Sequence, residues 1–426
     1  MIREDFLQYI WRYRLFNSEY LYYLEEKIEI IETGQLNNSS GPDFFNSKIK
    51  IGNTIWAGNV EIHVKSSDWF RHGHHEDPAY ENVILHMVYE NDKQVFRNNG
   101  EAIPTARLTF NPEIYKKYNA LTISNEIKEC YPHIMKMEKV VYRDWLGKLE
   151  FSRLERKTKE VEVMLKNNHF HWDSVLYEMM AMAFGMKLNA EPFRLLSQSV
   201  PLNFVMKYRD KPDTLLSAFY GKAGFLNGKN QFFKDDKKFL VEYSAIKILL
   251  PGPSVETLAW KKMRARPAGF PEVRIAQFIG FARNNFPFFE RLKSIENIKE
   301  LRKIILDGIK MDLPEIKKST LSSKQIMPLP GKDTLNSWII NSFVPILFYY
   351  GRFSNKHFFI DRSIDFLEQL PAENNEILKK WNKFGLIPEN AFDSQALIEL
   401  KTQFCSKQKC MNCIIGHQLL SNAAKK

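Results

Sequence analysis

The chain has 426 residues and a net charge of +11, with 44% hydrophobic and 13% aromatic residues. This composition excludes an intrinsically disordered chain and is typical of a folded protein with two or three domains. Four cysteines, together with a charged, amphipathic start that lacks an apolar signal segment, predict a reduced cytoplasmic protein rather than a secreted disulfide scaffold.

The first 100 residues predict a compact α/β domain with the order helix, three strands, short helix, strand. Gly52-Asn53 is typical of a hairpin turn, and Asp77 is a candidate N-cap before Pro78 of the short helix. From their hydrophobic periodicity, the predicted helix covers residues 5–23 and the predicted strands cover residues 27–33, 44–51, 54–69 and 83–92.

From about residue 140 the periodicity becomes helical. The apolar run 338–350 is too short to cross a bilayer and contains Pro345, so we expect a core helix and no membrane partner. We predict an α/β domain over 1–100, a connecting segment over 101–139 and a helical domain over 140–426 that includes a C-terminal cysteine motif. The predicted helices cover residues 145–165, 173–188, 256–267, 271–286 and 297–306, and a linker is expected over 317–333.

Charge is divided unevenly between these parts. Residues 1–100 carry 10 Lys and Arg against 15 Asp and Glu, a net of −5, whereas the remainder carries 51 against 35, a net of +16. An acidic first domain followed by a basic one suits a cation-binding centre next to a surface that binds a polyanion.

Polar side chains share one face of the predicted strand that contains VEIHVK. Alternation places Glu61, His63 and Lys65 on the same side, and the preceding hairpin brings Asp43 towards them. Two carboxylates that converge from different strands are ligands that Mg²⁺ or Mn²⁺ prefers, and a neighbouring Lys or His can orient or deprotonate a water.

This arrangement resembles the PD-(D/E)XK, or restriction-endonuclease-like, nucleases. Pro42-Asp43 matches the first half of their motif and Glu61 matches the acid of the second half, but His63 stands where that family has Lys. The resemblance implies an α-β-β-β-α-β core, and hence an α+β chain with a restriction-endonuclease-like core followed by a mostly α-helical domain. It also implies a Mg- or Mn-dependent nuclease in which Asp43 and Glu61 hold the metal and Lys65 or His63 positions the attacking water.

Five of the ten histidines fall between residues 63 and 86. We expect Asp68, His72, His74 and Asp77 beside the site as substrate contacts or as partners of the metal ligands. One alternative is a zinc or manganese centre built from His63, His72, His74 and Asp77. Another is an ordinary solvent-facing strand, which is polar at alternate residues.

Longer phrases, GPDF, WAGNVEIHVKSSDW, NVILHMVYEND and CMNCIIG, resemble an uncharacterised bacterial family called domain of unknown function 2851. The chain lacks the G-x-x-x-x-G-K-[ST], G-x-G-x-x-G, G-x-S-x-G and H-E-x-x-H motifs, which argues against motor, dinucleotide, serine-hydrolase and zincin chemistry. Two function classes remain, a nuclease and a non-catalytic nucleic-acid-binding or scaffold protein.

The C-terminal segment predicts a second metal site. Cys405, Cys410 and Cys413 have the spacing C-x₄-C-x₂-C. His417 would complete a Cys₃His zinc site, and Cys130 would complete a Cys₄ zinc site or an iron–sulfur cluster. Buried thiols without a metal are the alternative.

A basic segment surrounds a turn near Pro271 and predicts contacts with the phosphates of DNA or RNA, because guanidinium groups near a helix N-terminus suit phosphate. A solvated basic face or a patch of ion pairs is the alternative. The candidate residues are Lys261, Lys262, Arg264, Arg266 and Arg274.

Overall fold

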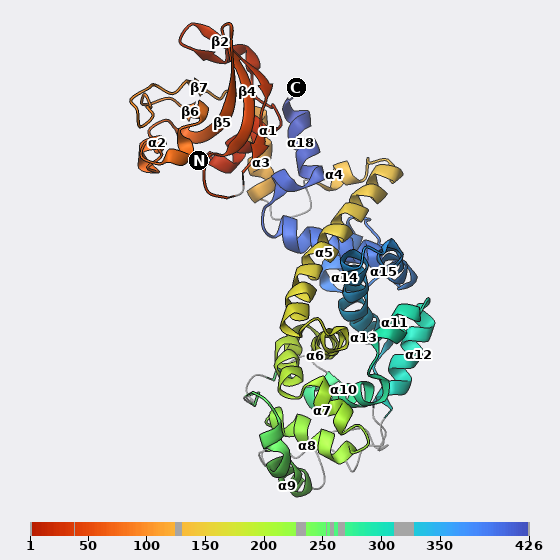
Figure 1. The fold of residues 1–426 in the computed structure, drawn as a ribbon. Helices are drawn as coiled ribbons and strands as arrows, with labels where there is room; N and C mark the ends of the chain where they lie inside the picture. Colours follow the sequence, from red (N-terminus) through yellow and green to blue (C-terminus); the bar gives the residue numbers. More distant parts are fainter. Residues whose placement is uncertain are drawn as a thin grey trace. The chain divides into compact units, whose positions relative to one another are not determined.

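The computed structural model divides into two compact units, Met1–Trp145 with Leu400–Lys426, and Leu146–Glu399. The first unit contains the β-sheet and the second is helical (Figure 1). This arrangement confirms the predicted α+β class. The structure describes residues 2–37, 39–123, 130–226, 236–252, 254–255, 260–262, 269–310 and 328–424.

The sheet of the first unit has the order β1-β2-β4-β5-β6-β7, with β3 paired to β4. The pairs up to β4–β5 are antiparallel, whereas β5–β6 and β6–β7 are parallel. The bounds are β1 Tyr22–Tyr23, β2 Glu26–Glu32, β3 Gln35–Leu36, β4 Phe44–Ile51, β5 Thr54–Lys65, β6 Val83–Glu90 and β7 Thr105–Arg107.

Four predicted strands are confirmed as β2, β4, β5 and β6, but the strand predicted over 54–69 is too long, because β5 ends at Lys65 and α2 begins at Asp68. The hairpin is confirmed, since Ile51 pairs with Thr54 around Gly52. The predicted helix over 5–23 is too long. Helix α1 covers Glu4–Arg12, and Arg14 then adopts a left-handed conformation with φ of 52°, which ends the helix. The apolar residues after it belong to a turn and to β1.

The core of the first unit lies between α1 and the sheet. Phe6 and Ile10 of α1 are fully buried, as are Phe44 and Val60 of the central strands. Because side chains alternate along β5, the residues that enter this core leave Glu61 and His63 on the opposite side of the strand. The packing therefore fixes which side chains reach the site.

A short helix, α2 (Asp68–Arg71), and a turn at Pro78–Tyr80 connect β5 to its parallel neighbour β6. Asp77 accepts a hydrogen bond from the backbone N–H of Ala79, which confirms the predicted N-cap. The helices that follow in this unit are α3 Pro112–Ile123, α4 Tyr131–Ile134 and α18 Ile414–Ala424.

The sequence assigns the C-terminal segment to the helical domain, but this segment belongs to the first unit in the structure. The reason is apolar packing, since α18 contacts α3 and buries Ile415, Leu419 and Leu420. Before α18 the chain forms a π-helical turn over Leu400–Cys405 and a 3₁₀ turn over Cys410–Asn412.

The second unit has one large apolar core, in which Phe184 stacks on Trp338 with ring centroids 3.8 Å apart. The apolar run 338–350 lies in this core, as predicted. None of the helices in the described part of the chain is long and apolar enough to cross a membrane. Helix α5 (Lys139–Asn167) leads into this unit. Its other helices are α6 Trp172–Ser199, α7 Leu202–Lys207, α8 Pro212–Lys222, α9 Asp236–Ile246, α10 Pro271–Asn285, α11 Phe289–Ser294, α12 Ile298–Ile309, α13 Lys332–Trp338, α14 Val344–Phe353, α15 His357–Gln369, α16 Glu376–Lys383 and α17 Ala391–Glu399.

Candidate metal centre

Asp43 and Glu61 converge as the sequence predicts. The backbone N–H of Asp43 donates to Glu61 Oε2 at 2.9 Å. In return, Asp43 Oδ2 accepts from the backbone N–H of Ile62 at 3.0 Å, and Oδ1 accepts from Gln8 Nε2 at 2.8 Å. Both side-chain oxygens of Asp43 therefore accept hydrogen bonds from the chain, and the backbone N–H of Asp43 holds Glu61 in place.

The second oxygen of Glu61 faces two imidazoles. Glu61 Oε1 lies 3.4 Å from His63 Nε2 and 3.3 Å from His74 Nε2. His63 belongs to β5, as does Glu61, and His74 belongs to the loop after α2.

Burial shifts the pKa of both carboxyl groups. Burial, followed by the charge of Glu61, raises the pKa of Asp43 to about 7, although its hydrogen bonds from Gln8 and Ile62 oppose the shift. Burial raises the pKa of Glu61 to about 8. The charge of Glu4, one helical turn before Gln8, contributes to the raised pKa of both groups.

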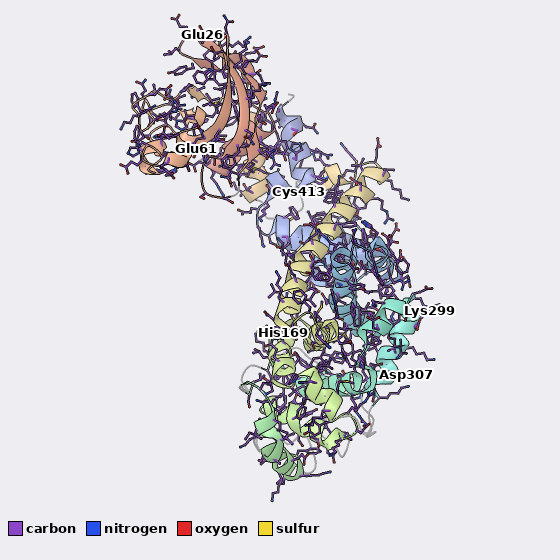
Figure 2. The ribbon with its side chains drawn as sticks, viewed as in Figure 1. Glu26, Glu61, His169, Lys299, Asp307 and Cys413 are labelled. Atoms are coloured by element: carbon purple, nitrogen blue, oxygen red, sulfur yellow. The ribbon has the colours of Figure 1, made fainter. Side chains whose placement is uncertain are left out.

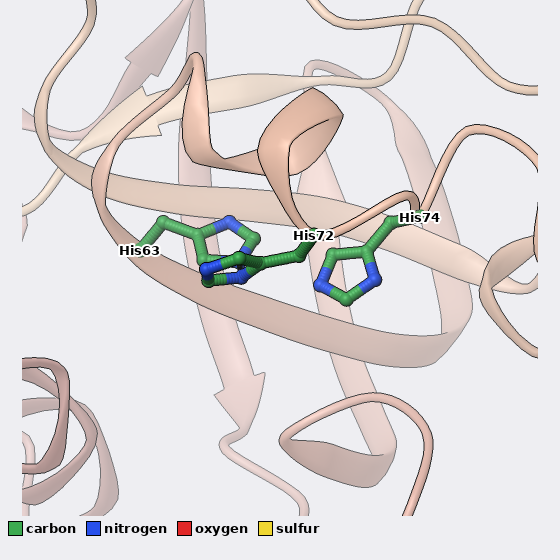
Figure 3. A group of neighbouring side chains, drawn as sticks. All are labelled: His63, His72 and His74. Atoms are coloured by element: carbon green, nitrogen blue, oxygen red, sulfur yellow. Dashed lines mark hydrogen bonds between the residues drawn. The ribbon is translucent and has the colours of Figure 1, made fainter.

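His63 contacts two further histidines. His63 Nδ1 lies 2.8 Å from His86 Nε2, and His63 Nε2 lies 3.1 Å from His72 Nδ1. Within the described residues, His63, His72 and His74 form the one group of three or more candidate ligands whose donor atoms all lie within 4.8 Å of one another. Figure 3 shows the three rings together, with His72 and His74 approaching His63 from the loop after α2.

Burial favours the neutral form of His63, His74 and His86, which is the form of imidazole that binds metal. Burial lowers the pKa of His63 to about 2 and that of His86 to about 3, and it also lowers the pKa of His74. His74 stacks on Tyr80 with centroids 3.8 Å apart, which fixes the plane of its ring.

The remaining candidates near the motif lie outside the histidine group. Lys65 is exposed and its ammonium forms an ion pair with Glu90 at 3.4 Å. Asp68 accepts from the backbone N–H of Lys65 and pairs with Arg71, so it stabilises the start of α2. Asp77 is the cap described above, and it is not part of the histidine group.

Three site residues were missed in the sequence, namely Glu4, Gln8 and His86. Glu4 and Gln8 are one helical turn apart on α1, and a polar pair on one side of a helix whose other residues are mostly apolar was a usable signal. His86 lies in a buried apolar strand and was noted only as part of the histidine count. Its place follows from the parallel register, which pairs it with Glu61.

The cysteine segment lies in the first unit, as does Glu61 (Figure 2). None of the four cysteines forms a disulfide. Burial, followed by the charges of Cys413 and Cys410, raises the pKa of Cys405 to about 12. The ring nitrogens of His417 contact Tyr9 and Ser421 instead.

Cys130 immediately precedes α4, which packs against α18. The thiols do not meet the 4.8 Å spacing that the histidines meet. The predicted zinc or iron–sulfur site stays a prediction.

The basic segment is only partly described. Arg264 and Arg266, with most of the predicted helix over 256–267, lie outside the described residues. Lys261 is exposed, whereas Lys262 pairs with Glu272. Arg274 is 9% exposed and its guanidinium lies over the Trp338 ring, so it is placed in the core rather than on a phosphate-binding surface.

A family model described as a protein of unknown function (DUF2851) matches residues 4–376. The chain belongs to this family. No curated protein and no solved structure matches the chain. Membership confirms the resemblance to domain of unknown function 2851 over residues 4–376, which leave out the phrase CMNCIIG, whereas the resemblance to PD-(D/E)XK nucleases is not confirmed by these comparisons and remains a prediction.

Proposed function

We propose that this protein is a divalent-metal-dependent nuclease whose centre is the face of β5 that carries Glu61 and His63. One observation carries the proposal: the buried carboxylate of Glu61, which accepts a hydrogen bond from half-buried Asp43, contacts two members of a group of three histidines that have the spacing of metal ligands. Buried titratable groups with strongly shifted pKa values are typical of functional sites. The longer elements of the first unit, α1, β2, β4, β5, α2 and β6, follow the order of the core that the nuclease resemblance implies, with the two-residue strands β1 and β3 added before β5 and with β7 after β6.

The side chains fit the predicted Mg²⁺ poorly. Mg²⁺ prefers oxygen ligands and retained waters. Both oxygens of Asp43 accept hydrogen bonds from the chain, and Glu61 directs a single oxygen at the centre. We therefore assign no step to Mg²⁺ between Asp43 and Glu61.

A divalent cation, when bound, supplies positive charge to the scissile phosphate. The chain contributes the remaining chemistry. Glu61 Oε1, held by Asp43, is placed to accept a proton from an attacking water. The exposed guanidinium of Arg71, next to His72, is placed to bind a phosphate oxygen.

Nucleic acid is the proposed partner because the chain beyond residue 100 carries a net charge of +16, from 51 basic and 35 acidic residues. Binding through phosphates should weaken steeply with salt. Substituting Arg264 and Arg266 with Ala should reduce the slope of log K against log salt by about 2. An unchanged slope would remove the basic segment from the interface.

The test of the nuclease is purified protein incubated with labelled DNA and RNA, single- and double-stranded, with Mn²⁺, Zn²⁺ or Mg²⁺ and after chelation. We expect cleavage that requires added metal and is lost in Glu61→Gln. If nucleic acid binds but no substrate is cut, the second function class stands, a non-catalytic nucleic-acid-binding or scaffold protein.

A further inference from the structure

We propose that His63, His72 and His74 bind a zinc-class transition-metal ion, and that buried His86 orients His63 for this ion. The inference deepens the proposed function by naming the metal and its ligands. It rests on that function only for the role of the ion, because metal binding is measured without substrate.

The donor atoms decide the class of ion. Imidazole nitrogen suits Zn²⁺ and related transition metals, whereas carboxylate and water oxygens suit Mg²⁺. The group of mutually close donors consists of three nitrogens, and neither oxygen of Asp43, each of which accepts a hydrogen bond from the chain, belongs to it. The segment whose sequence resembles an oxygen-ligand site therefore presents nitrogen ligands in the fold.

The spacing of the donors agrees with this class. Ligands about 2.0–2.1 Å from a tetrahedral zinc ion lie about 3.3 Å from one another. His63 Nε2 and His72 Nδ1 are 3.1 Å apart, and a nitrogen of His74 lies within 4.8 Å of both histidines' donor atoms. Catalytic zinc sites use three protein ligands and leave one position open. Glu61 Oε1, 3.3 Å from His74 Nε2, borders that position.

The charge of the acidic residues near the histidines also favours a metal ion. Glu61 is 5% exposed, and in the described part of the chain no lysine or arginine nitrogen lies within 4.0 Å of the carboxylates of Glu4, Asp43 or Glu61. A buried acid such as Glu61 is costly without a cationic partner. A divalent ion among the three imidazoles supplies the positive charge that Glu61 and the two half-buried acids near it lack.

His86 selects the ring nitrogen of His63 that can bind. A metal at Nε2 requires the proton on Nδ1, and this N–H then donates to His86 Nε2 at 2.8 Å. Such a partner on the far ring nitrogen fixes both the tautomer and the ring orientation of a ligating histidine. The other nitrogen of His86, Nδ1, is buried without a hydrogen-bond partner among the described residues, so His63 is the partner that the described chain offers to this ring.

The experiment measures metal directly. Chelated full-length protein is titrated with Zn²⁺, and metal content is counted after dialysis, for wild type, His72→Ala, His74→Ala and the matched control His75→Ala. His75 is the neighbouring histidine outside the group, and His72 and His74 are not core residues. We expect His72→Ala and His74→Ala each to lose one zinc per chain. Their zinc affinity should fall by more than the factor of about 10 to 100 that is typical when a partner of a ligand, rather than the ligand itself, is changed.

Cobalt separates this site from the cysteine segment. Co²⁺ bound by thiolates gives strong near-ultraviolet charge-transfer absorption, whereas Co²⁺ bound by imidazoles gives only visible bands. We expect His74→Ala to lose visible bands and to leave any thiolate absorption unchanged. If His72→Ala and His74→Ala bind the same number of zinc ions as tightly as His75→Ala does, the inference is overturned.

His86 is tested by two substitutions in proteins shown to be folded by circular dichroism. His86→Leu removes the acceptor and should weaken zinc binding about 10- to 100-fold. His86→Gln keeps an acceptor oxygen and should restore most of that loss. Equal affinity of both folded variants and wild type would exclude the positioning role.

The two proposals fail separately. Zinc that is lost with His74 in a protein that cuts no substrate would overturn the nuclease and leave the metal site standing. Cleavage by a protein whose zinc content and affinity are unchanged in His72→Ala and His74→Ala would overturn the metal site and leave the nuclease standing.

Discussion

Buried charged residues in the helical unit differ from Glu61 in the first unit in the partners that they contact. In the helical unit, Arg153 lies 3.0 Å from Glu150, and Arg362 donates to the backbone carbonyls of Lys293 and Ile295. In the first unit, the buried carboxylate of Glu61 faces imidazoles instead. Arg153 and Arg362 have partners that offset their buried charge, whereas one oxygen of Glu61 faces imidazoles whose neutral form burial favours, which is typical of a functional site.

The comparison predicts that core truncation in the helical unit changes stability and not chemistry. Phe184→Ala removes the ring that stacks on Trp338 and should lower the free energy of unfolding by about 3–5 kcal/mol. Urea denaturation checks this value, with exposed Val163→Ala as a control expected within about 0.5 kcal/mol of wild type. Zinc affinity of the folded variant should be unchanged. A weakened zinc site would show that the units are energetically coupled.

Glu61→Gln should impair cleavage without lowering stability, which is the opposite of what we expect for Phe184→Ala. We expect the rate of cleavage to fall on the order of 100- to 1000-fold, because the carboxylate that accepts a proton from the attacking water is lost. The free energy of unfolding of metal-free protein should stay equal or rise, since burial raises the pKa of Glu61 to about 8 and an amide removes a costly buried charge. Exposed Glu76→Gln is the matched control. Parallel losses of cleavage and stability in Glu61→Gln would assign Glu61 a structural role.

Much of this site was predictable because strand alternation is strict. The face shared by Glu61 and His63, the hairpin that brings Asp43 near them, and the cap at Asp77 all follow from local patterns. The role of Asp43 did not follow, because its oxygens are claimed by Gln8 and by a backbone N–H that only the folded chain places there.

Long-range placement accounts for the other misses. His86 reaches His63 through a parallel pairing whose register no local pattern specifies. The cysteine segment follows the helical unit in sequence but packs with the first unit, because α18 buries its apolar face against α3. Sequence distance was a poor guide to both contacts.

The cysteine segment tests whether the first unit holds a second ligand. If Cys405, Cys410 and Cys413 share a metal, purified protein should contain stoichiometric zinc, or should be coloured if the metal is an iron–sulfur cluster. Cys410→Ser with Cys413→Ser should abolish it and, at a free metal concentration 100 times the Kd, remove about 2.7 kcal/mol of stability. Metal-free protein in which all three thiols are alkylated would rule the site out.

The smallest expected effect is that of replacing Lys65, which tests whether the lysine of the sequence motif takes part in the chemistry. Lys65 is the lysine that the nuclease resemblance offers as a catalytic group, yet it stands four residues beyond Glu61, about 13 Å along the strand. Its side chain is 50% exposed and pairs with Glu90, which is 55% exposed. Exposed pairs of this kind contribute about 0–1 kcal/mol.

Lys65→Ala should therefore lower the free energy of unfolding by less than about 1 kcal/mol. It should change cleavage by no more than about fivefold, which is that energy expressed as a ratio. Glu90→Gln is the informative control, because it breaks the same ion pair and leaves the ammonium in place. Equal, small effects in both variants would assign Lys65 to the surface. If Lys65→Ala abolishes cleavage and Glu90→Gln does not, the lysine acts on the substrate and the chemistry depends on the ammonium rather than on the imidazole of His63.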